Sequence, residues 1–259
     1  MGVEIDLDGL RALVTGAGQG VGAGIATMLA AAGAEVAVND VDTSRAQAVV
    51  DRISAAGGRA VPAAFDVTDY PAVAAAVDGL GGVDILVNNA GNAGTAGWTG
   101  LAPLVETRPE DWEPYLRVNL YGVMHCMRAA LPAMIERSWG RIITIISDAG
   151  RTGESHMAAY CAAKAGAAGF SRGVAHEVGR FGITVNNVAL GTMRTPISAA
   201  TWDDIEQNPR AQALMQRYVI RRPGEPEDAA GLVLYLASRL SSWVTAQTYP
   251  LNGGYSSAL

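Results

Sequence analysis

The 259-residue sequence is poor in cysteine and in charged residues, and each deficit excludes a class of protein. Its two cysteines, Cys126 and Cys161, belong to no cluster with metal-ligand spacing, so we expect two reduced thiols and no metal site. Basic residues are outnumbered and the net charge is −6, which argues against nucleic acid or an anionic membrane surface as the partner. Charged residues make up only 17% and hydrophobic residues 49%, a balance that excludes global disorder and supplies a large core.

Long apolar runs are also missing. The apolar segment 21–32 is too short to cross a bilayer. The first ten residues are acidic and lack the basic flank and apolar stretch of a secretory signal peptide. Together with the reduced thiols, these features predict a cytoplasmic protein with no membrane partner.

What the sequence does contain is an alternation of strand-like and helix-like segments. Strands are predicted at residues 11–15, 35–39, 60–64, 83–87, 141–146, 183–189 and 248–251. Helices are predicted at residues 21–32, 43–56, 70–80, 107–136, 156–180 and 227–239. The helix over 107–136 is expected to start with a capping box at 107–110 and to be disturbed at Pro114 and Pro132. Residues 190–225 are expected to form an irregular insert with short helices.

Uniformly apolar strands that alternate with helices predict a parallel sheet covered on both faces. Right-handed crossovers then give a single doubly wound α/β domain of about seven strands. No low-complexity linker or repeat divides the chain.

The segment TGAGQGVG at residues 15–22 lies between the first strand and the first helix. Glycines there allow a tight turn and a close approach to a pyrophosphate, whose charge the helix N-terminus favours. The alternative is an ordinary tight turn. Because a βαβ unit surrounds the segment, dinucleotide binding is the stronger interpretation.

Asp40 closes the second predicted strand, where an acid can accept hydrogen bonds from a ribose diol and repel a 2′-phosphate. The alternative is a strand-end turn or a helix N-cap. Gln19 in the glycine segment is not basic, and no Lys or Arg follows Asp40 before Arg45. The predicted cofactor is therefore NAD rather than NADP.

Residues 140–170 bring together groups that can move a proton. Ser147 ends a predicted strand, and Tyr160 and Lys164, four residues apart on a predicted helix, share one helix face. Lys164 could stabilise the Tyr160 phenolate; lowering a phenol pKa from about 10 by about 3 units requires about 4 kcal/mol. The alternative is a packed aromatic ring with a snorkelling lysine.

These motifs, taken together, resemble the classical short-chain dehydrogenase/reductase family over nearly the whole chain. The resemblance is carried by TGAGQGVG (15–22), NNAG (88–91), Asn119 in RVN, Ser147, YCAAK (160–164), GTMRTP (191–196) and LNGG (251–254). It implies one Rossmann-type, NAD-binding catalytic domain over residues 1–259, with a substrate loop at about 190–225, and a homotetramer. Trp243 and Tyr249 could pack against a symmetry mate.

The resemblance also implies a role for individual residues. Catalysis would fall to a tetrad in which Tyr160 acts as acid or base, and Tyr160 and Lys164 would contact the cofactor as well. No residue is assigned to a metal. The implied tetrad is Asn119, Ser147, Tyr160 and Lys164. The implied cofactor contacts are Gly16, Gly18, Gln19 and Val21 at the pyrophosphate, Asp40 at the adenosine ribose, Asp66 and Val67 at the adenine, Asn89, Ala90 and Gly91 beside the ribose, and Met193 and Thr195 at the nicotinamide amide and phosphate.

Two positions depart from the family pattern. Leu190 stands where the family usually has Pro, which frees the backbone at a cofactor-facing turn and could make the following loop more mobile. Asp148 follows Ser147, where a small or apolar residue is commoner. Its carboxylate could face the substrate mouth, but we favour exposure to solvent or a local turn bond.

The substrate is expected to have an apolar body. Segments 93–104, 151–157 and 190–218 should surround the nicotinamide, and their apolar side chains could line the substrate site or form a lid core or subunit contact. These side chains are Trp98, Leu101, Met157, Met193, Ile197, Trp202, Leu214 and Met215. Arg151, His156 and Arg194 are candidate handles for a carboxylate or phosphate, or else solvated charges.

The sequence thus predicts an NAD-dependent oxidoreductase that interconverts a secondary alcohol and a ketone on a small molecule of ring or acyl type. One alternative is a 3-oxoacyl-thioester reductase, which would favour NADPH. Another is a dinucleotide-binding sensor or scaffold without turnover, which a damaged tetrad would have favoured.

Overall fold

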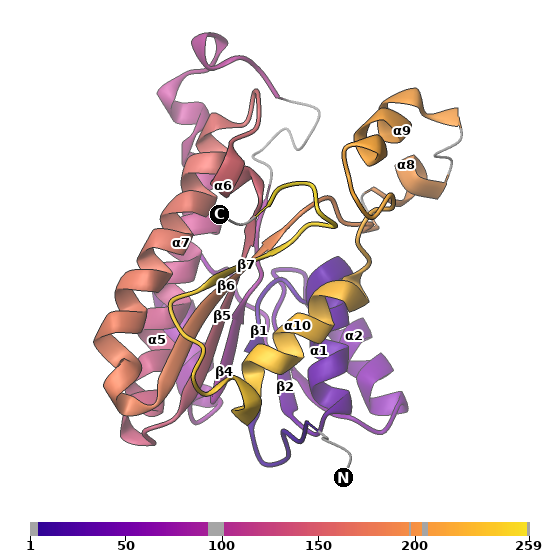
Figure 1. The fold of residues 1–259 in the computed structure, drawn as a ribbon. Coiled ribbons are helices and arrows are strands. Elements are labelled where there is room, and N and C mark those ends of the chain that lie inside the picture. Colours follow the sequence, from indigo (N-terminus) through magenta and orange to yellow (C-terminus); the bar gives the residue numbers. More distant parts are fainter. Residues whose placement is uncertain (1–4, 93–100, 197, 204–206, 258–259) are drawn as a thin grey trace.

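The computed structural model describes residues 5–92, 101–196, 198–203 and 207–257 (Figure 1). The described residues form one sheet in the strand order β3-β2-β1-β4-β5-β6-β7, and every neighbouring pair is parallel. The strands are β1 (Arg11–Val14), β2 (Glu35–Val38), β3 (Arg59–Pro62), β4 (Ile85–Asn88), β5 (Gly140–Ser147), β6 (Ile183–Leu190) and β7 (Thr248–Leu251). The fold is therefore the predicted Rossmann-type, doubly wound parallel sheet.

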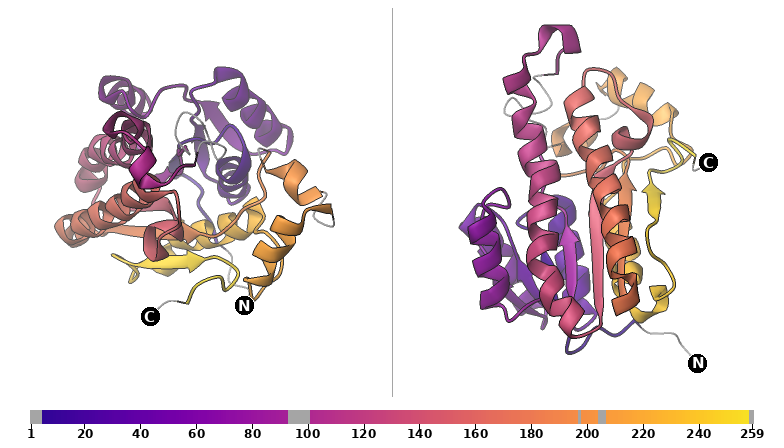
Figure 2. Two further views of the ribbon diagram at one scale, coloured as in Figure 1. Left: turned by 90° about the horizontal axis from the view of Figure 1, so that it is seen from above. Right: turned by 90° about the vertical axis from the view of Figure 1, so that its left-hand side faces the viewer.

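Helices cover both faces of this sheet. The longer helices are α1 (Gly20–Ala31), α2 (Thr43–Ala55), α3 (Tyr70–Gly79), α5 (Gly122–Glu136), α7 (Ala158–Val178) and α10 (Pro226–Ala237). The shorter helices are α4 (Glu113–Leu116), α6 (Ala149–Thr152), α8 (Ala199–Asp203) and α9 (Pro209–Gln216). Figure 1 shows α5 and α7 on one face and α1, α2 and α10 on the other. In the side view of Figure 2, α3 lies on the same face as α5 and α7.

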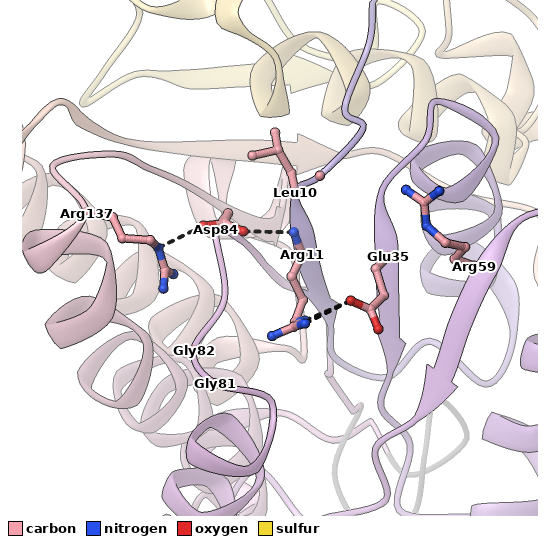
Figure 3. Close-up of a pocket in the computed structure, with 9 residues that line it drawn as sticks. Leu10, Arg11, Glu35, Arg59, Gly81, Gly82, Asp84 and Arg137 are labelled. Atoms are coloured by element: carbon pink, nitrogen blue, oxygen red, sulfur yellow. Dashed lines mark hydrogen bonds and ion pairs between the residues drawn. The ribbon is translucent and has the colours of Figure 1, made fainter.

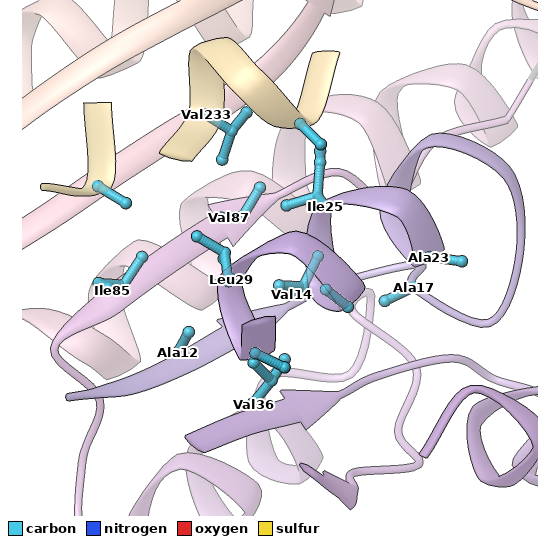
Figure 4. Close-up of a cluster of buried hydrophobic side chains, with 14 of the residues drawn as sticks. Ala12, Val14, Ala17, Ala23, Ile25, Leu29, Val36, Ile85, Val87 and Val233 are labelled. Carbon is cyan, nitrogen blue, oxygen red and sulfur yellow. The ribbon is translucent and has the colours of Figure 1, made fainter. Parts of the chain in front are cut away.

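Each face of the sheet has its own hydrophobic core, because successive residues of a strand point to opposite sides. In β1, Ala12 and Val14 belong to the core under α1, α2 and α10, whereas Leu13 belongs to the core under α3, α5 and α7. Figure 4 shows Leu29 of α1 and Val233 of α10 over the strands of the first core; both are fully buried. Burying one such side chain stabilises the fold by about 1.5–3 kcal/mol.

All the predicted strands are present, and apart from the helix over 107–136 the predicted elements end within two residues of the observed ones. The prediction of one helix over 107–136 is wrong. The chain there forms a 3₁₀ turn at Pro109–Asp111, then α4, a π-helical turn at Arg117–Tyr121, and α5. The capping carboxylate belongs to Asp111 rather than Glu110, because Asp111 accepts a hydrogen bond from the Arg108 N–H at 2.8 Å.

The order of the strands places the site. From β1 the sheet grows outwards through β2 and β3 on one side and through β4 to β7 on the other. The connections from β1 and β4 thus leave in opposite directions, and ligands of such folds bind at this switch point, beyond the carboxyl ends of the strands. Within the part of the chain that the structure describes, no helix combines the length and apolarity that a membrane span requires.

Candidate active site

The glycine segment after β1 forms a tight turn, here called the cradle, that packs closely against the loop after β4. Gly16 has a φ of 60° and its N–H donates to Asn39 Oδ1 at 3.2 Å. A Cβ on Gly16 would lie 2.8 Å from Ala90 Cα, and one on Gly22 would lie 2.4 Å from Asn89 Nδ2. Only glycine therefore lets this loop meet the loop after β4.

The N-terminus of α1 lacks a capping side chain. Gln19 occupies the N-cap position, yet its side chain makes no capping hydrogen bond. The first N–H groups of α1 and the positive end of the helix dipole are left for an anion. Val21 is buried in the first turn, which fixes the helix against the sheet. These features fit the pyrophosphate of a dinucleotide.

Asp40 lies directly after β2 and is 6% exposed. Its carboxylate accepts hydrogen bonds from the N–H groups of Gly18 and Asp42, and it pairs with Arg45 Nη2 at 3.0 Å. A Cβ on Gly18 would lie 2.5 Å from Asp40 Oδ2. The acid is therefore held at the predicted ribose end of the cradle, but Arg45 offsets part of its charge, a contact that the sequence did not reveal.

The loop after β4 is tied to the glycine segment by Thr15. Its Oγ1 accepts hydrogen bonds from the N–H groups of Asn89 and Ala90, both at 3.0 Å. Asn89 Nδ2 in turn donates to the carbonyl oxygens of Thr15 and Gly16. Thr15 was not predicted as a site residue, although its position at the head of the glycine motif was the available signal.

The remaining predicted cofactor contacts lie around the same edge. Asp66 and Val67 follow β3; the Asp66 carboxylate accepts from the Thr68 N–H, and Val67 is buried. Thr195 comes close to the glycine segment, since a Cβ on Gly20 would lie 3.5 Å from its Cγ2. Met193 pairs with Gly224 in an isolated parallel bridge, so it lies at the base of the loop that Thr195 continues.

Three of the four tetrad residues converge at the end of β5. Ser147 is the last residue of β5, and its side chain makes a hydrogen bond with Tyr160. Lys164 lies one helical turn after Tyr160 in α7, with its Nζ 5.8 Å from the centre of the Tyr160 ring. Lys164 Nζ also donates to the Ile145 carbonyl at 3.1 Å. The predicted convergence of Ser147, Tyr160 and Lys164 is therefore what the structure shows.

Asn119, the fourth residue, lies within the π-helical turn. The predicted disturbance at Pro132 is absent, since α5 continues through that residue. Asn119 Nδ2 donates to the Tyr115 carbonyl at 2.9 Å, the bond that the Asn119 N–H would make in a regular α-helix. The same amide group bonds to Asn92. A Cβ on Gly91 would lie 2.9 Å from Asn119 Oδ1 and 3.2 Å from Lys164 Nζ. Asn119 and Lys164 therefore both lie beside Gly91, which places Asn119 near the other three residues.

The two titratable tetrad residues are both buried, and burial decides the direction of their pKa values. Burial raises the pKa of the Tyr160 phenol to about 12, against the smaller lowering effect of its hydrogen bond with Ser147. Burial also lowers the pKa of the Lys164 ammonium to about 8. The expected lowering of the Tyr160 pKa is absent from the chain without a cofactor, because desolvation outweighs the hydrogen bond with Ser147.

The prediction that Asp148 faces solvent is wrong. Asp148 is 3% exposed, and it pairs with Arg151 and accepts a hydrogen bond from Asn252 Nδ2 at 3.0 Å. The local turn bond, which was predicted as the other possibility for Asp148, is present: it is the ion pair with Arg151, three residues later. Arg194 likewise pairs with Asp203 and approaches Glu225, so neither arginine is an unpaired handle for a substrate.

Other predicted substrate-side residues have mixed outcomes. Trp98 and Ile197 lie outside the described residues. Leu190 is buried and is the last residue of β6, paired in register with Ser147 and Leu251. Its carbonyl accepts a hydrogen bond from the Asp148 N–H at 2.8 Å. His156 adopts a positive φ of 65° just before α7.

A polar cavity of about 330 Å³ lies at the opposite, amino edge of the sheet (Figure 3). It is lined by Arg11, Glu35, Asp84 and Arg137, which are joined in ion pairs, and by Arg59, which pairs with Asp8 outside the lining. The cavity is therefore separate from the edge where the predicted site residues gather, and its charges are already paired.

Taken together, an uncapped helix N-terminus beside a glycine cradle faces a phenol, an ammonium and a hydroxyl that can handle one proton. Such a site defines an oxidoreductase that works with a nicotinamide dinucleotide. Comparison with known proteins places the chain more narrowly: it belongs to the short-chain dehydrogenase/reductase family, in its classical form. A family model described as "Enoyl-(Acyl carrier protein) reductase" matches residues 16–256.

Two curated relatives span the chain. It is 39% identical over 251 residues to "(2S)-[(R)-hydroxy(phenyl)methyl]succinyl-CoA dehydrogenase subunit BbsD" of Thauera aromatica, covering 95% of this chain and 96% of that protein. It is 35% identical over 256 residues to the 7alpha-hydroxysteroid dehydrogenase of Escherichia coli strain K12, covering 97% and 96%.

Two solved structures have the same fold and differ in their cofactors. A gluconate 5-dehydrogenase from Burkholderia cenocepacia, in complex with NADP and tartrate, has a TM-score of 0.89 at 35% identity over 98% of each chain. A 3-oxoacyl-[acyl-carrier protein] reductase from Brucella melitensis, with bound NAD, has a TM-score of 0.87 at 32% identity over 98% of this chain and 94% of the other.

Proposed function

We propose that this protein is an NAD-dependent oxidoreductase that interconverts a secondary alcohol and a ketone on a largely apolar substrate of ring or acyl type. The observation that carries the proposal is the convergence of Ser147, Tyr160 and Lys164 where β5 and α7 meet. The named relatives support it, since one acts on a steroid and another on a phenyl-bearing CoA thioester.

The dinucleotide supplies the hydride acceptor or donor, and the chain supplies the proton chemistry. In the oxidation of an alcohol, the accepting group is the Tyr160 phenolate, which takes the hydroxyl proton and becomes the phenol; in the reduction of a ketone, the phenol gives its proton to the developing alkoxide and becomes the phenolate. Ser147 Oγ holds the substrate oxygen beside that phenol, which fixes the distance over which the proton moves. Because Ser147 and Tyr160 share a hydrogen bond, their two hydroxyl groups are close enough to contact the same substrate oxygen.

Lys164 and Asn119 support this exchange. The Lys164 ammonium offsets the negative charge that forms on Tyr160, and the low exposure of both groups strengthens that interaction. The Ile145 carbonyl fixes Lys164 Nζ on one side. Asn119 Oδ1 and Lys164 Nζ both approach Gly91, and a water held between them would connect Lys164 to solvent.

NAD is preferred over NADP in this proposal because the Asp40 carboxylate lies at the ribose end of the cradle. A 2′-phosphate would meet that charge, whereas a ribose diol can donate to it. The pairing with Arg45 weakens the repulsion of a 2′-phosphate, so we expect a higher kcat/KM with NAD but measurable activity with NADP. Initial rates with both cofactors test this: a higher kcat/KM with NADP would overturn the assignment.

The proposed activity is tested by following NADH fluorescence over a panel of secondary alcohols, sterol-ring fragments and hydroxyacyl thioesters, with NADP in parallel. We expect NADH formation with at least one class and no activity from the Tyr160→Phe variant. A protein that binds NADH but shows no turnover of any member, in either direction, would favour the non-catalytic sensor.

A 3-oxoacyl-thioester reductase is the second candidate. It is favoured by relatives of that name, such as the enzyme of Synechocystis at 38% identity over 94% of this chain. Asp40 opposes the NADPH preference predicted for that activity. The thioester arm of the panel separates the two, because an enzyme of this kind would oxidise the hydroxyacyl thioesters faster than the free alcohols.

The assembly is proposed to be a homotetramer. Trp243 is 98% exposed, and β7, which contains Tyr249, is the edge strand of the sheet; both features suit a contact between copies. A monomer mass by light scattering at working concentration would refute this. A cytoplasmic location is proposed because Cys126 and Cys161 are both free thiols.

A further inference from the structure

The turn after β5 contains an acid with no place in the mechanism above. Asp148 follows Ser147 and its side chain is 4% exposed, while its partner Arg151 is 22% exposed. One carboxylate oxygen pairs with Arg151 and the other accepts from Asn252 Nδ2 at 3.0 Å. A buried charge is retained at a cost unless it is fully paired, so this contact requires a reason.

Asn252 and Arg151 connect Asp148 to the carboxyl-terminal turn, residues 252–256. Asn252 Nδ2 also approaches the carbonyl oxygen and Oγ of Ser256 at 3.0 and 2.9 Å. Arg151 Nη1 donates to the same Ser256 Oγ at 3.1 Å. Further along, Tyr255 OH donates to Glu154 at 3.4 Å. The segment 147–154 is thus bonded to the carboxyl-terminal turn at several points.

The other side of the same turn holds the substrate loop, residues 190–225. The rings of Tyr255 and Tyr218 lie 5.0 Å apart, and Tyr218, which is 5% exposed, bonds through its hydroxyl to the N–H and Oγ1 of Thr192. The Ile220 N–H donates to the Gly253 carbonyl at 2.8 Å. The carboxyl-terminal turn therefore lies between the serine-bearing turn and the loop.

We propose that Asp148 is a positioning residue, which acts through Arg151 and Asn252 to fasten the turn that carries Ser147 to the carboxyl-terminal turn and, through Tyr255, to the substrate loop. The three segments then hold one arrangement, so that the Ser147 hydroxyl and the loop keep a fixed relation to each other. The proposal rests on the proposed function only for its kinetic consequence.

The chemistry of the contact requires a carboxylate. Both groups that reach Asp148, the Arg151 guanidinium and the Asn252 amide nitrogen, are donors. An amide at position 148 offers one acceptor and one donor, so one of the two contacts becomes a repulsive pair of donors. Asp148→Asn therefore breaks the connection with almost no change of volume.

The kinetic test compares Asp148→Asn with a matched control. Asp8→Asn removes the carboxylate that pairs with Arg59, at the other end of the molecule from Ser147. We expect Asp148→Asn to lower kcat/KM for the substrate at least fivefold, with the dissociation constant of NADH within twofold of wild type, and the control to change neither. A kcat/KM within twofold of wild type would overturn the proposal.

Hydrogen exchange by mass spectrometry supplies a test that needs no substrate. Asp148→Asn should speed amide exchange in residues 217–220, which Asp148 does not touch, as well as in 147–154 and 252–256. Faster exchange only in the two touching segments would refute the connection to the loop. If the wild-type protein turned over no substrate, the proposed function would fail while the exchange result still decided this inference.

Discussion

Lys164 is a buried ammonium, and replacing it should change how stability depends on pH. Burial lowers its pKa from 10.5 to about 8 in the folded chain. Between these two values the unfolded chain holds a proton that the folded chain does not, so the free energy of unfolding rises with pH from about 8 to about 10.5. Below pH 8 the folded chain bears the full cost of the buried charge, which is about 3 kcal/mol for a pKa difference of this size.

Lys164→Met has a side chain of similar length without the charge, so it should remove this pH dependence. It also leaves the Ile145 carbonyl without its Lys164 bond, which costs about 1–3 kcal/mol at every pH. The difference in unfolding free energy between variant and wild type should therefore shift by about 2.5 kcal/mol between pH 7 and pH 10, in favour of wild type as pH rises.

Urea denaturation followed by circular dichroism, without cofactor and at one protein concentration, measures this difference. Burial raises the pKa values of Tyr160 and Cys126 to about 12, so both groups stay protonated in the folded chains up to pH 10 and drop out of the comparison. A difference that stays constant within about 0.5 kcal/mol from pH 7 to pH 10 would show that Lys164 does not bear the cost assigned to it.

Three further changes act on the site itself. Tyr160→Phe should keep NADH binding and lower kcat at least a hundredfold, because the proton carrier is gone; near-normal turnover would contradict its role. Asp40→Asn should raise the ratio of kcat/KM for NADP over NAD at least tenfold, and an unchanged ratio would remove the carboxylate from cofactor choice. Gly22→Ala should weaken NADH binding at least tenfold, because its Cβ would lie 2.4 Å from Asn89 Nδ2. The matched change Gly173→Ala, in α7 with nothing within 4 Å of the new Cβ, should leave binding intact.

Local patterns were sufficient to predict the sheet and the convergence of Ser147, Tyr160 and Lys164, whereas the tetrad as a set came from the family resemblance. A buried parallel strand is an apolar run, and Tyr160 and Lys164 had to share a face because they are four residues apart on a helix. The glycine segment could also be identified locally, because its function depends on the strand before it and the helix after it within one βαβ unit. Asn119 was assigned from the family resemblance. The disturbance predicted at Pro114 does not coincide with the π-helical turn, because Pro114 lies in the first turn of α4, where proline is tolerated.

Contacts between distant segments were not predictable in this way. Nothing in the residues around Asp148 shows that Asn252 lies beside it, since 104 residues separate the two along the chain. Packing also decides two more local features. The pairing of Arg45 with Asp40 depends on how α2 leaves β2, and the direction of the Tyr160 pKa shift depends on burial that only the assembled chain creates. The sequence pattern thus shows which groups are present, and the packing sets their charge and partners.

The π-helical turn at Arg117–Tyr121 amounts to one extra residue inserted into a helix that otherwise continues through α5. The inserted residue offsets the two halves by about 100°, so that α5 can bury Met127 and Met134 against the sheet while Asn119 turns towards the active site. This helix therefore tolerates substitutions better than changes of length. Deleting a single residue between α4 and α5 would restore a regular helix and force a choice between the core contacts of α5 and the place of Asn119 beside Lys164.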